Sequence, residues 1–406
     1  MIFKLPQLTH KFSQSLVLLF CWTVVPLFLV ELLMTILDPI LFTRGLYQYD
    51  PDLGFRVRPY VLNSNQFGFN DRDYSAIKDP GTYRMVILSD SFNWAGGREG
   101  NCTAILEQKF VQHYGKHQVD VINVGYPGTH TGEQLEILKK YGLTYQPDLV
   151  ILGFFAGNDF VDADPERKRI IVNDLYIDID RDREWILFGY PIIPQSRLWL
   201  FLQQKYKIFS EFSKTEPQPF SSPSPDVPQV NPQSFFPLLP VIASEPTPAP
   251  PGFSRETFLA LERSRLEFCN TYPLYQTGDY QPKIDYILGK IEEISQLLAS
   301  KNIKFMVAIY PDEFQVNDQL LDTIIDNFNV KADYYERDCQ QNILNRFLTE
   351  KNIPHIDFLP QFKAQQKQQP LYVFQDPHWN EAGNQLAAQI LFETLVQKTD
   401  QFFAEN

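Results

Sequence analysis

The sequence lacks any concentration of positive charge. Lysine and arginine number 36 against 49 aspartate and glutamate residues, which gives a formal net charge of −13. Proteins that bind nucleic acid need a basic patch or stripe to contact the phosphates, and the sequence contains no such run. We therefore expect no nucleic-acid partner, and the acidity bears mainly on solubility.

Cysteine is also scarce, since the chain holds only Cys21, Cys102, Cys269 and Cys339. None of them belongs to a CxxC pair, and no histidine–cysteine cluster has the spacing of a zinc site. We therefore predict no metal and no other cofactor. The last three cysteines are widely spaced and can be free thiols or include one disulfide, so cysteine usage leaves the redox compartment open.

Charge is absent from one long stretch near the N-terminus. Residues 12–30 carry no charged side chain, a length that can cross the hydrocarbon core of a bilayer as a helix. Lys4 and Lys11 precede the run, and the next basic residue lies well beyond it, which by the positive-inside rule places the N-terminus in the cytoplasm. The prediction is a cytoplasmic stub at 1–11, a single-pass membrane anchor at 12–37 and an extracytoplasmic remainder.

Two other interpretations of this run stay open. A cleaved signal peptide would have a similar apolar core, although no small-x-small cleavage site follows the run. A buried helix of the globular domain would also be apolar, and it is less favoured because such helices usually have one polar face.

Beyond the run, the chain alternates between strand-like and helix-like segments. Residues 38–82 form a leading arm, which we expect to contain a small hairpin or to be an ordered extension. Strands are predicted at about 84–90, 119–125, 148–155, 303–311 and 353–359, and helices at about 99–114, 131–145, 283–300, 331–350 and after Asn380. This order predicts an α/β fold with a doubly wound sheet of five parallel strands.

An insertion at about 161–281 interrupts the domain, which we place at 83–400. Residues 169–188 alternate with a period of two and predict a hairpin, and a helix is predicted at 195–212. The segment 214–252 contains twelve prolines, a density that forbids a helix or a central strand. We interpret this segment as a flexible or polyproline-like loop.

Polar residues lie at the edge of the predicted sheet where doubly wound folds bind their ligands. Ser91 follows the first strand, Gly128 lies in the turn after the second, and Asn158 follows the third. Asp376 and His378 precede the last helix. A hydroxyl, a glycine turn, a carboxamide, an imidazole and a carboxylate are thus expected at one edge.

This set suits acyl transfer through a serine. A serine hydroxyl needs a base within hydrogen-bond reach, and the base needs a third group that fixes its tautomer. We therefore predict a catalytic triad of Ser91 as nucleophile, His378 as base and Asp376 as the orienting carboxylate. The backbone N–H groups of Ser91 and Gly128 and the amide of Asn158 are the predicted oxyanion hole.

The same segments resemble, in chain order, the blocks of the SGNH/GDSL hydrolase family. S-D-S-F at 89–92, N-V-G-Y-P-G at 123–128, G-N-D at 157–159 and D-P-H-W-N at 376–380 are similar to its nucleophile, glycine, asparagine and histidine blocks. The stretch at 63–73 resembles one that precedes the catalytic block in membrane-anchored bacterial members. The resemblance implies a flavodoxin-like sheet of SGNH type, with metal-independent esterase, lipase, deacetylase or O-acyltransferase activity.

One residue departs from the family pattern, because Ser89 stands where a glycine usually precedes Asp90. Two functions are therefore considered. The first is a membrane-anchored enzyme that hydrolyses an acyl ester or transfers its acyl group, with an envelope or exported polysaccharide as candidate substrate. The second is an envelope assembly protein on a degenerate hydrolase scaffold, which only Ser89 favours.

Overall fold

The computed structural model describes residues 6–41, 46–115, 118–172, 175–180, 185–187, 190–193, 195–214, 253–271 and 280–397. The chain divides into two compact units, Met1–Phe42 with Pro194–Pro251, and Thr43–Ile193 with Gly252–Asn406. The second unit contains the parallel sheet and every predicted site residue. The predicted Pro-rich segment lies outside the described residues, apart from Lys214 at the end of a helix.

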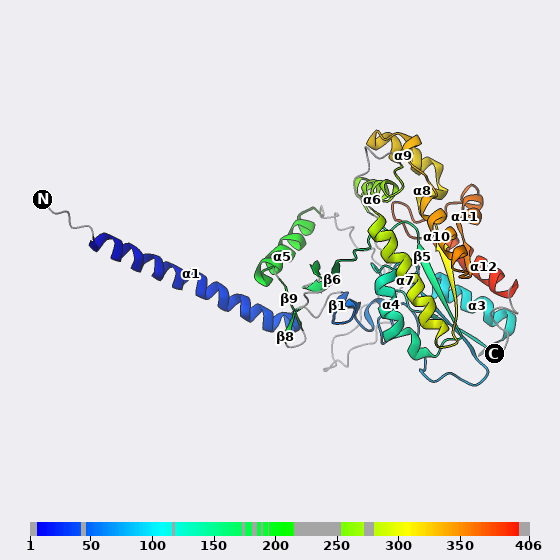
Figure 1. Ribbon diagram of the computed structural model, residues 1–406, viewed down its shortest axis with the longest axis horizontal. Helices are drawn as coiled ribbons and strands as arrows, with labels where there is room; N and C mark the ends of the chain where they lie inside the picture. The colour runs from blue at the N-terminus through cyan, green and yellow to red at the C-terminus, as the bar shows by residue number, and fades with distance from the viewer. Residues whose placement is uncertain are drawn as a thin grey trace, which may run out of the picture. The chain divides into compact units, whose positions relative to one another are not determined.

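The second unit, in which Figure 1 labels strand β5, is built on five parallel strands in the order β11-β10-β5-β3-β4. The strands are β3 (Tyr83–Leu88), β4 (Val119–Asn123), β5 (Leu149–Phe155), β10 (Lys304–Tyr310) and β11 (His355–Asp357). Each corresponds to one of the predicted strands. Numbered along the chain, the strands follow the flavodoxin-like order 2-1-3-4-5. The predicted α/β fold with a five-stranded parallel sheet is therefore confirmed.

Helices cover both faces of this sheet. One layer contains α4 (Thr131–Lys140), α7 (Gln281–Ala299) and α10 (Cys339–Glu350), and the other contains α3 (Cys102–Tyr114), α11 (Leu359–Gln366) and α12 (Glu381–Gln397). Val86 and Leu88 of β3 pack into the first layer, whereas Met85 and Ile87 pack into the second. This alternation has the period of two expected for a strand buried on both faces.

The leading arm begins as the hairpin that the sequence predicts. β1 (Tyr47–Asp50) pairs antiparallel with β2 (Gly54–Val57), and a 3-10 turn follows at Val61–Asn63. Gly68, further along the arm, has a φ of +90°, and a Cβ there would lie 2.4 Å from the carbonyl oxygen of Val57. Only glycine allows the arm to approach its own hairpin this closely.

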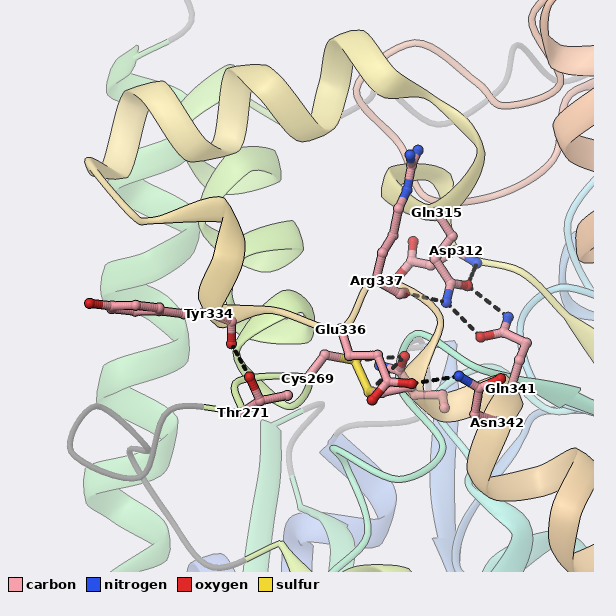
Figure 2. The surroundings of a disulfide bond; sticks show 11 residues. Cys269, Thr271, Asp312, Gln315, Tyr334, Glu336, Arg337, Gln341 and Asn342 are labelled. Atoms are coloured by element: carbon pink, nitrogen blue, oxygen red, sulfur yellow. Dashed lines mark hydrogen bonds between the residues drawn. A yellow bond between two sulfur atoms is a disulfide. The ribbon is translucent and has the colours of Figure 1, made fainter.

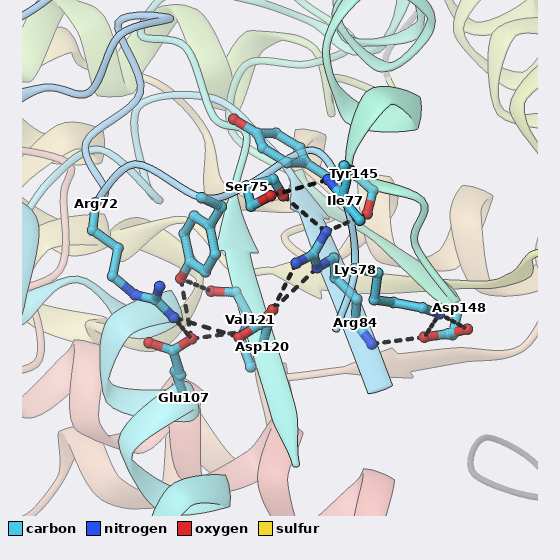
Figure 3. A network of polar contacts seen from close by, with 11 residues as sticks. Arg72, Ser75, Ile77, Lys78, Arg84, Glu107, Asp120, Val121, Tyr145 and Asp148 are labelled. Atoms are coloured by element: carbon cyan, nitrogen blue, oxygen red, sulfur yellow. Dashed lines mark hydrogen bonds and ion pairs between the residues drawn. The ribbon is translucent and has the colours of Figure 1, made fainter. Parts of the chain in front are cut away.

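Charged side chains attach the rest of the arm to the sheet (Figure 3). Arg72 pairs with Glu107 of α3 and with Asp120 of β4, at 2.8 and 3.5 Å. Lys78 pairs with Asp148 at 2.6 Å. The pairs of Arg72 hold the arm against α3 and the edge strand β4, and Lys78 holds it to the residue that precedes the middle strand β5.

The insertion contains the predicted hairpin, formed by β6 (Arg167–Val172) and β7 (Leu175–Asp180), with its turn at 173–174 outside the described residues. A shorter antiparallel pair, β8 (Trp185–Leu187) and β9 (Tyr190–Ile192), follows. Four described helices of the unit were not predicted: α6 (Arg255–Glu267), α8 (Glu313–Val316), α9 (Asp318–Phe328) and α11. Short helical turns occur at α2 (Gly97–Gly100), η2 (Gly142–Tyr145) and η5 (Ala332–Tyr334).

The helix predicted at 331–350 begins only at Cys339. The preceding residues form η5 and then an extended segment, in which Tyr335 bridges to Asn270. A disulfide joins Cys269 to Cys339, and the N–H of Thr271 donates to the carbonyl of Tyr334 beside it (Figure 2). The disulfide, left open by the sequence, therefore connects the end of α6 to the start of α10.

The first unit consists of α1 (Pro6–Leu41) and α5 (Arg197–Lys214). Glu31 of α1 accepts hydrogen bonds from Ser196 and from the N–H groups of Arg197 and Leu198, so it caps the start of α5. Within the described ranges, no helix combines the length and the apolarity that a bilayer crossing requires. The membrane anchor at 12–37 therefore stays a prediction.

Candidate active site

The predicted nucleophile lies on a tight turn directly after β3. The carbonyl of Ser91 accepts hydrogen bonds from the N–H groups of Trp94 and Ala95, at 3.1 and 2.8 Å. The carboxylate of Asp90 accepts the N–H of Phe92 at 3.0 Å and so closes the turn from its other side. The side chain of Ser91 is left half-buried at the carboxyl end of the strand.

The predicted base and its carboxylate lie on a loop that folds back on itself before α12. The N–H of Val373 donates to the carbonyl of His378 at 2.9 Å, and the N–H of Asp376 donates to that of Val373 at 3.1 Å. Gln375, between them, has a φ of +54°. The reversal allows Asp376 to accept the backbone N–H of His378 as well as its ring, although the two are only two residues apart.

The structure brings the three triad residues together. Nδ1 of His378 lies 2.6 Å from Oδ1 of Asp376, and Nε2 of the same ring lies 2.8 Å from Oγ of Ser91. A proton on Nδ1 that donates to Asp376 leaves Nε2 free to accept the hydroxyl proton of Ser91. This is the arrangement in which an imidazole can act as general base toward a serine.

Electrostatics around the triad favour a charged Asp376. Burial pushes the pKa of Asp376 upward, but the hydrogen bonds and charge of His378, together with Arg265, outweigh it and place the pKa below its ordinary value. Burial raises the pKa of Asp90 to about 6, against the opposing effects of the Phe92 N–H, His378 and Arg265. An ionised Asp376 stabilises the imidazolium that forms when His378 takes a proton.

The predicted oxyanion donors follow the neighbouring strands at the same edge of the sheet. Gly128 comes after β4 with a φ of +75°, and the hydroxyl of Tyr176 lies 3.6 Å from the position of a Cβ there. The N–H of Tyr126, two residues earlier, donates to the carbonyl of Ser89, so this loop lies against the nucleophile strand. Asn158 comes after β5, and its Nδ2 donates to Asp162 at 3.2 Å. An amide nitrogen has two hydrogens, so one remains for an oxyanion.

Comparison with protein families gives a match over the C-terminal part of the chain. Residues 270–405 match the family model described as "SGNH hydrolase-like domain, acetyltransferase AlgX". Over these residues the chain is similar to an SGNH hydrolase-like domain. The matched residues include Asp376 and His378, and with Ser91 in hydrogen-bond contact the site is that of an enzyme acting on ester bonds, by hydrolysis or by acyl transfer.

No curated protein matches the chain. Similar solved structures include the acetyl xylan esterase AlAXEase, at 14% identity and a TM-score of 0.38, with 77% of this chain and 99% of that chain covered. The esterase EstA from Pseudoalteromonas sp. has 10% identity and a TM-score of 0.37, covering 78% and 99%. The lipase/acylhydrolase from Enterococcus faecalis has 13% identity and a TM-score of 0.34, covering 78% and 97%.

The serine that replaces the usual SGNH glycine is accommodated inside the sheet. Ser89 is fully buried, and its hydroxyl donates to the carbonyl of Gly153 on the adjacent strand β5 at 3.0 Å. Its hydroxyl is therefore satisfied away from His378, whose ring bonds to Ser91 instead. The substitution leaves the hydrogen bonds of the triad in place.

A cluster of charged residues behind the SGNH site was missed by sequence reasoning. Arg265 of α6 is buried, and its Nη1 lies 2.8 Å from Glu262 and 3.4 Å from Asp312. Asp312 follows β10 and packs against Gly157, the residue before Asn158. A Cβ added to Gly157 would lie 2.2 Å from Oδ2 of Asp312. Charged residues on an amphipathic helix normally face solvent, so no sequence signal pointed to this cluster.

Proposed function

We propose that the protein is a serine enzyme that breaks an ester bond through a covalent acyl–Ser91 intermediate, without a metal. The observation that carries the proposal is the hydrogen-bonded series from Asp376 through His378 to Ser91, with contacts of 2.6 and 2.8 Å. A histidine with a purely structural role does not need a serine hydroxyl on one ring nitrogen and a carboxylate on the other, whereas a general base that activates a serine needs both.

The geometry supports the following steps. Oγ of Ser91 attacks the ester carbonyl carbon while its proton passes to Nε2 of His378. The carbonyl oxygen becomes an oxyanion held by N–H donors, for which Ser91, Gly128 and Asn158 are the proposed sources. The intermediate collapses, the C–O bond to the alcohol breaks, and His378 returns the proton to the departing oxygen. Water or another hydroxyl then attacks the acyl–serine and gives its proton to His378. The bond between the acyl group and Oγ of Ser91 breaks, and His378 returns the proton to Oγ.

The experiment that tests this proposal is labelling with a fluorophosphonate probe, which reacts with activated serines. Wild type should label and Ser91→Ala should not. Ser89→Ala is the matched control, because its hydroxyl is buried against Gly153, and it should label like wild type. Failure of wild type to label, with the protein folded, would refute the proposal and favour an assembly role on a degenerate scaffold.

The oxyanion donors have a separate test. Asn158→Ala should lower kcat by about 10²–10³-fold, as the loss of one oxyanion donor does elsewhere. Asp162→Asn is its control, because it changes the acceptor that Nδ2 bonds to and keeps the donor itself. Unchanged turnover in Asn158→Ala would remove this amide from the site.

O-acyl transfer is the second candidate, and the description of the matched family as an acetyltransferase favours it. Hydrolysis and transfer share every step up to acyl–Ser91 and differ in whether water or a sugar hydroxyl accepts the acyl group. Acetate release from an acetyl ester should be measured with and without an acceptor glycan. Acetylated glycan formed at the expense of free acetate would support transfer, whereas unchanged acetate release would support hydrolysis.

Placement of the catalytic domain outside the cytoplasmic membrane is the last part of the proposal. The exposed apolar side chains of α1, among them Leu19, Trp22 and Phe28, support insertion into lipid. The disulfide between Cys269 and Cys339 supports an oxidising compartment. The full-length protein should stay in the membrane pellet after an alkaline carbonate wash and be digested by protease added to spheroplasts. Recovery in the wash, or protection from the protease, would contradict this placement.

A further inference from the structure

The leading arm reaches the turn that carries the nucleophile. Nδ2 of Asn70, in the arm, donates to the carbonyl of Trp94 at 2.6 Å. The N–H of Trp94 in turn donates to the carbonyl of Ser91, so Asn70 bonds to the far side of the same turn. Asn70 is buried, with 3% of its surface exposed, and its bond to the turn is therefore shielded from water.

Asn123, the last residue of β4, connects the arm to both active-site loops. Its Nδ2 donates to the carbonyl of Asn93 at 2.6 Å and to that of Asn70 at 3.3 Å. Its Oδ1 accepts the N–H of Gly125 at 2.9 Å, in the loop that leads to Gly128. One fully buried side chain thus contacts the nucleophile turn, the arm and the glycine loop.

The arm also holds the glycine loop directly. Oδ2 of Asp71 accepts the backbone N–H of Asn123 at 2.8 Å. The hydroxyl of Tyr126 donates to the carbonyl of Phe67, and its ring stacks on Phe69 with centroids 4.6 Å apart. Four residues of the arm therefore contact the nucleophile turn, the end of β4 or the loop that leads to Gly128, namely Phe67, Phe69, Asn70 and Asp71.

We propose that Asn70 of the leading arm is a positioning residue that fixes Ser91 relative to the Gly128 loop. The inference rests on the proposed function, because it assigns Asn70 a role in the same acyl-transfer step. Asn70 does not touch the triad itself, and it acts through Trp94 and Asn123. Fixing two loops from a third segment matters because small misplacements of reacting groups reduce the rate steeply.

The test compares two variants of the same arm. Asn70→Ala removes the donor to the nucleophile turn, and Arg72→Met removes the ion pairs with Glu107 of α3 and Asp120 of β4 (Figure 3). Steady-state hydrolysis of p-nitrophenyl acetate and the rate of fluorophosphonate labelling should be measured at a temperature where both variants are folded by circular dichroism. We expect kcat and the labelling rate of Asn70→Ala to fall by about 10- to 100-fold with KM nearly unchanged. Arg72→Met should lose thermal stability and keep wild-type kcat.

Tyr126→Phe provides a milder second variant if Asn70→Ala does not fold. It keeps the stacked ring and removes only the hydroxyl that bonds to Phe67, and it should lower kcat in the same direction by a smaller factor. Wild-type kcat in folded Asn70→Ala, or in Tyr126→Phe when Asn70→Ala is unfolded, would overturn the inference, as would equal losses of kcat in Asn70→Ala and Arg72→Met. Wild type that neither labels nor hydrolyses would instead refute the proposed function, so the two failures are distinguishable.

Discussion

Removal of the disulfide between Cys269 and Cys339 has a stability cost that follows from the loop it closes. The two cysteines are 70 residues apart, and the closed loop contains α7, β10, α8 and α9. In the chain-entropy treatment, a loop of this length restricts the unfolded chain by about 4 kcal/mol at 25 °C. We therefore expect Cys269→Ala/Cys339→Ala to lower the free energy of unfolding by about 2–4 kcal/mol.

The folded state should change little when this bridge is absent. Thr271 still bonds to the carbonyl of Tyr334, and Gln315 and Gln341 still exchange side-chain hydrogen bonds beside the bridge (Figure 2). These contacts keep the two chain segments together in the native state, so the loss acts mainly through the unfolded state. Hydrolysis of a small ester by the folded double variant should stay within about twofold of wild type, since no triad hydrogen bond involves this region.

Urea unfolding at 25 °C, monitored by tryptophan fluorescence, measures the effect. Wild type should be compared with and without a phosphine reductant, alongside the double variant under both conditions. The reductant should destabilise wild type to the level of the double variant and leave the double variant unchanged. A loss below about 1 kcal/mol in the double variant would refute the loop-closure reasoning.

Three further predictions concern buried charges and close packing, and each is checked by urea unfolding. Arg265→Met should destabilise the protein by about 3–5 kcal/mol because it leaves the buried carboxyl groups of Glu262 and Asp312 without their cation. Glu262→Gln should cost less, because burial already raises the pKa of Glu262 and a neutral amide of the same shape can still bond to Arg265. Gly157→Ala should cost about 1–3 kcal/mol because the new Cβ would lie 2.2 Å from Oδ2 of Asp312. Burial raises the pKa of Asp71 to about 7, so the folded state binds more protons than the unfolded state between about pH 4 and pH 7. The free energy of unfolding therefore falls as pH rises through that window. Asp71→Asn should flatten this pH dependence, and an equally steep pH dependence in the variant would contradict the assignment of the effect to Asp71.

The strands of the sheet were predictable because each is a short apolar run buried on both faces. β5, for example, is entirely buried and contains no polar side chain, which distinguishes it from the surrounding amphipathic segments. The triad was predictable for a related reason, since Ser91 follows such a strand and Asp376 and His378 precede a terminal helix. What placed the three residues together was the rule that parallel strands present their carboxyl ends at one edge.

The insertion was harder to predict because its structure depends on distant partners. Twelve prolines precede α6 and suggested an irregular loop at 214–252, and no element was predicted between that loop and the end of the insertion at residue 281. The helix nevertheless forms, with Ser254 as its N-terminal cap, and buries Glu262 and Arg265 against Asp312, a residue almost fifty positions away. Local propensity indicates a helix only weakly here, and the buried ion pairs that hold it are invisible in the sequence.

The hydrogen bond between His378 and Ser91 joins a part of the chain that the family model matches to a part that it does not match. The matched residues 270–405 include His378 and Asp376, but Ser91 lies far upstream of them. A histidine–aspartate pair alone would be compatible with a structural role, because many buried histidines bond to carboxylates. The second ring nitrogen decides between these interpretations, since it lies 2.8 Å from a serine on the turn after β3. The geometry that supports Ser91 as the proposed nucleophile is therefore independent of the family match, and the arm residues that contact its turn belong to the same upstream part.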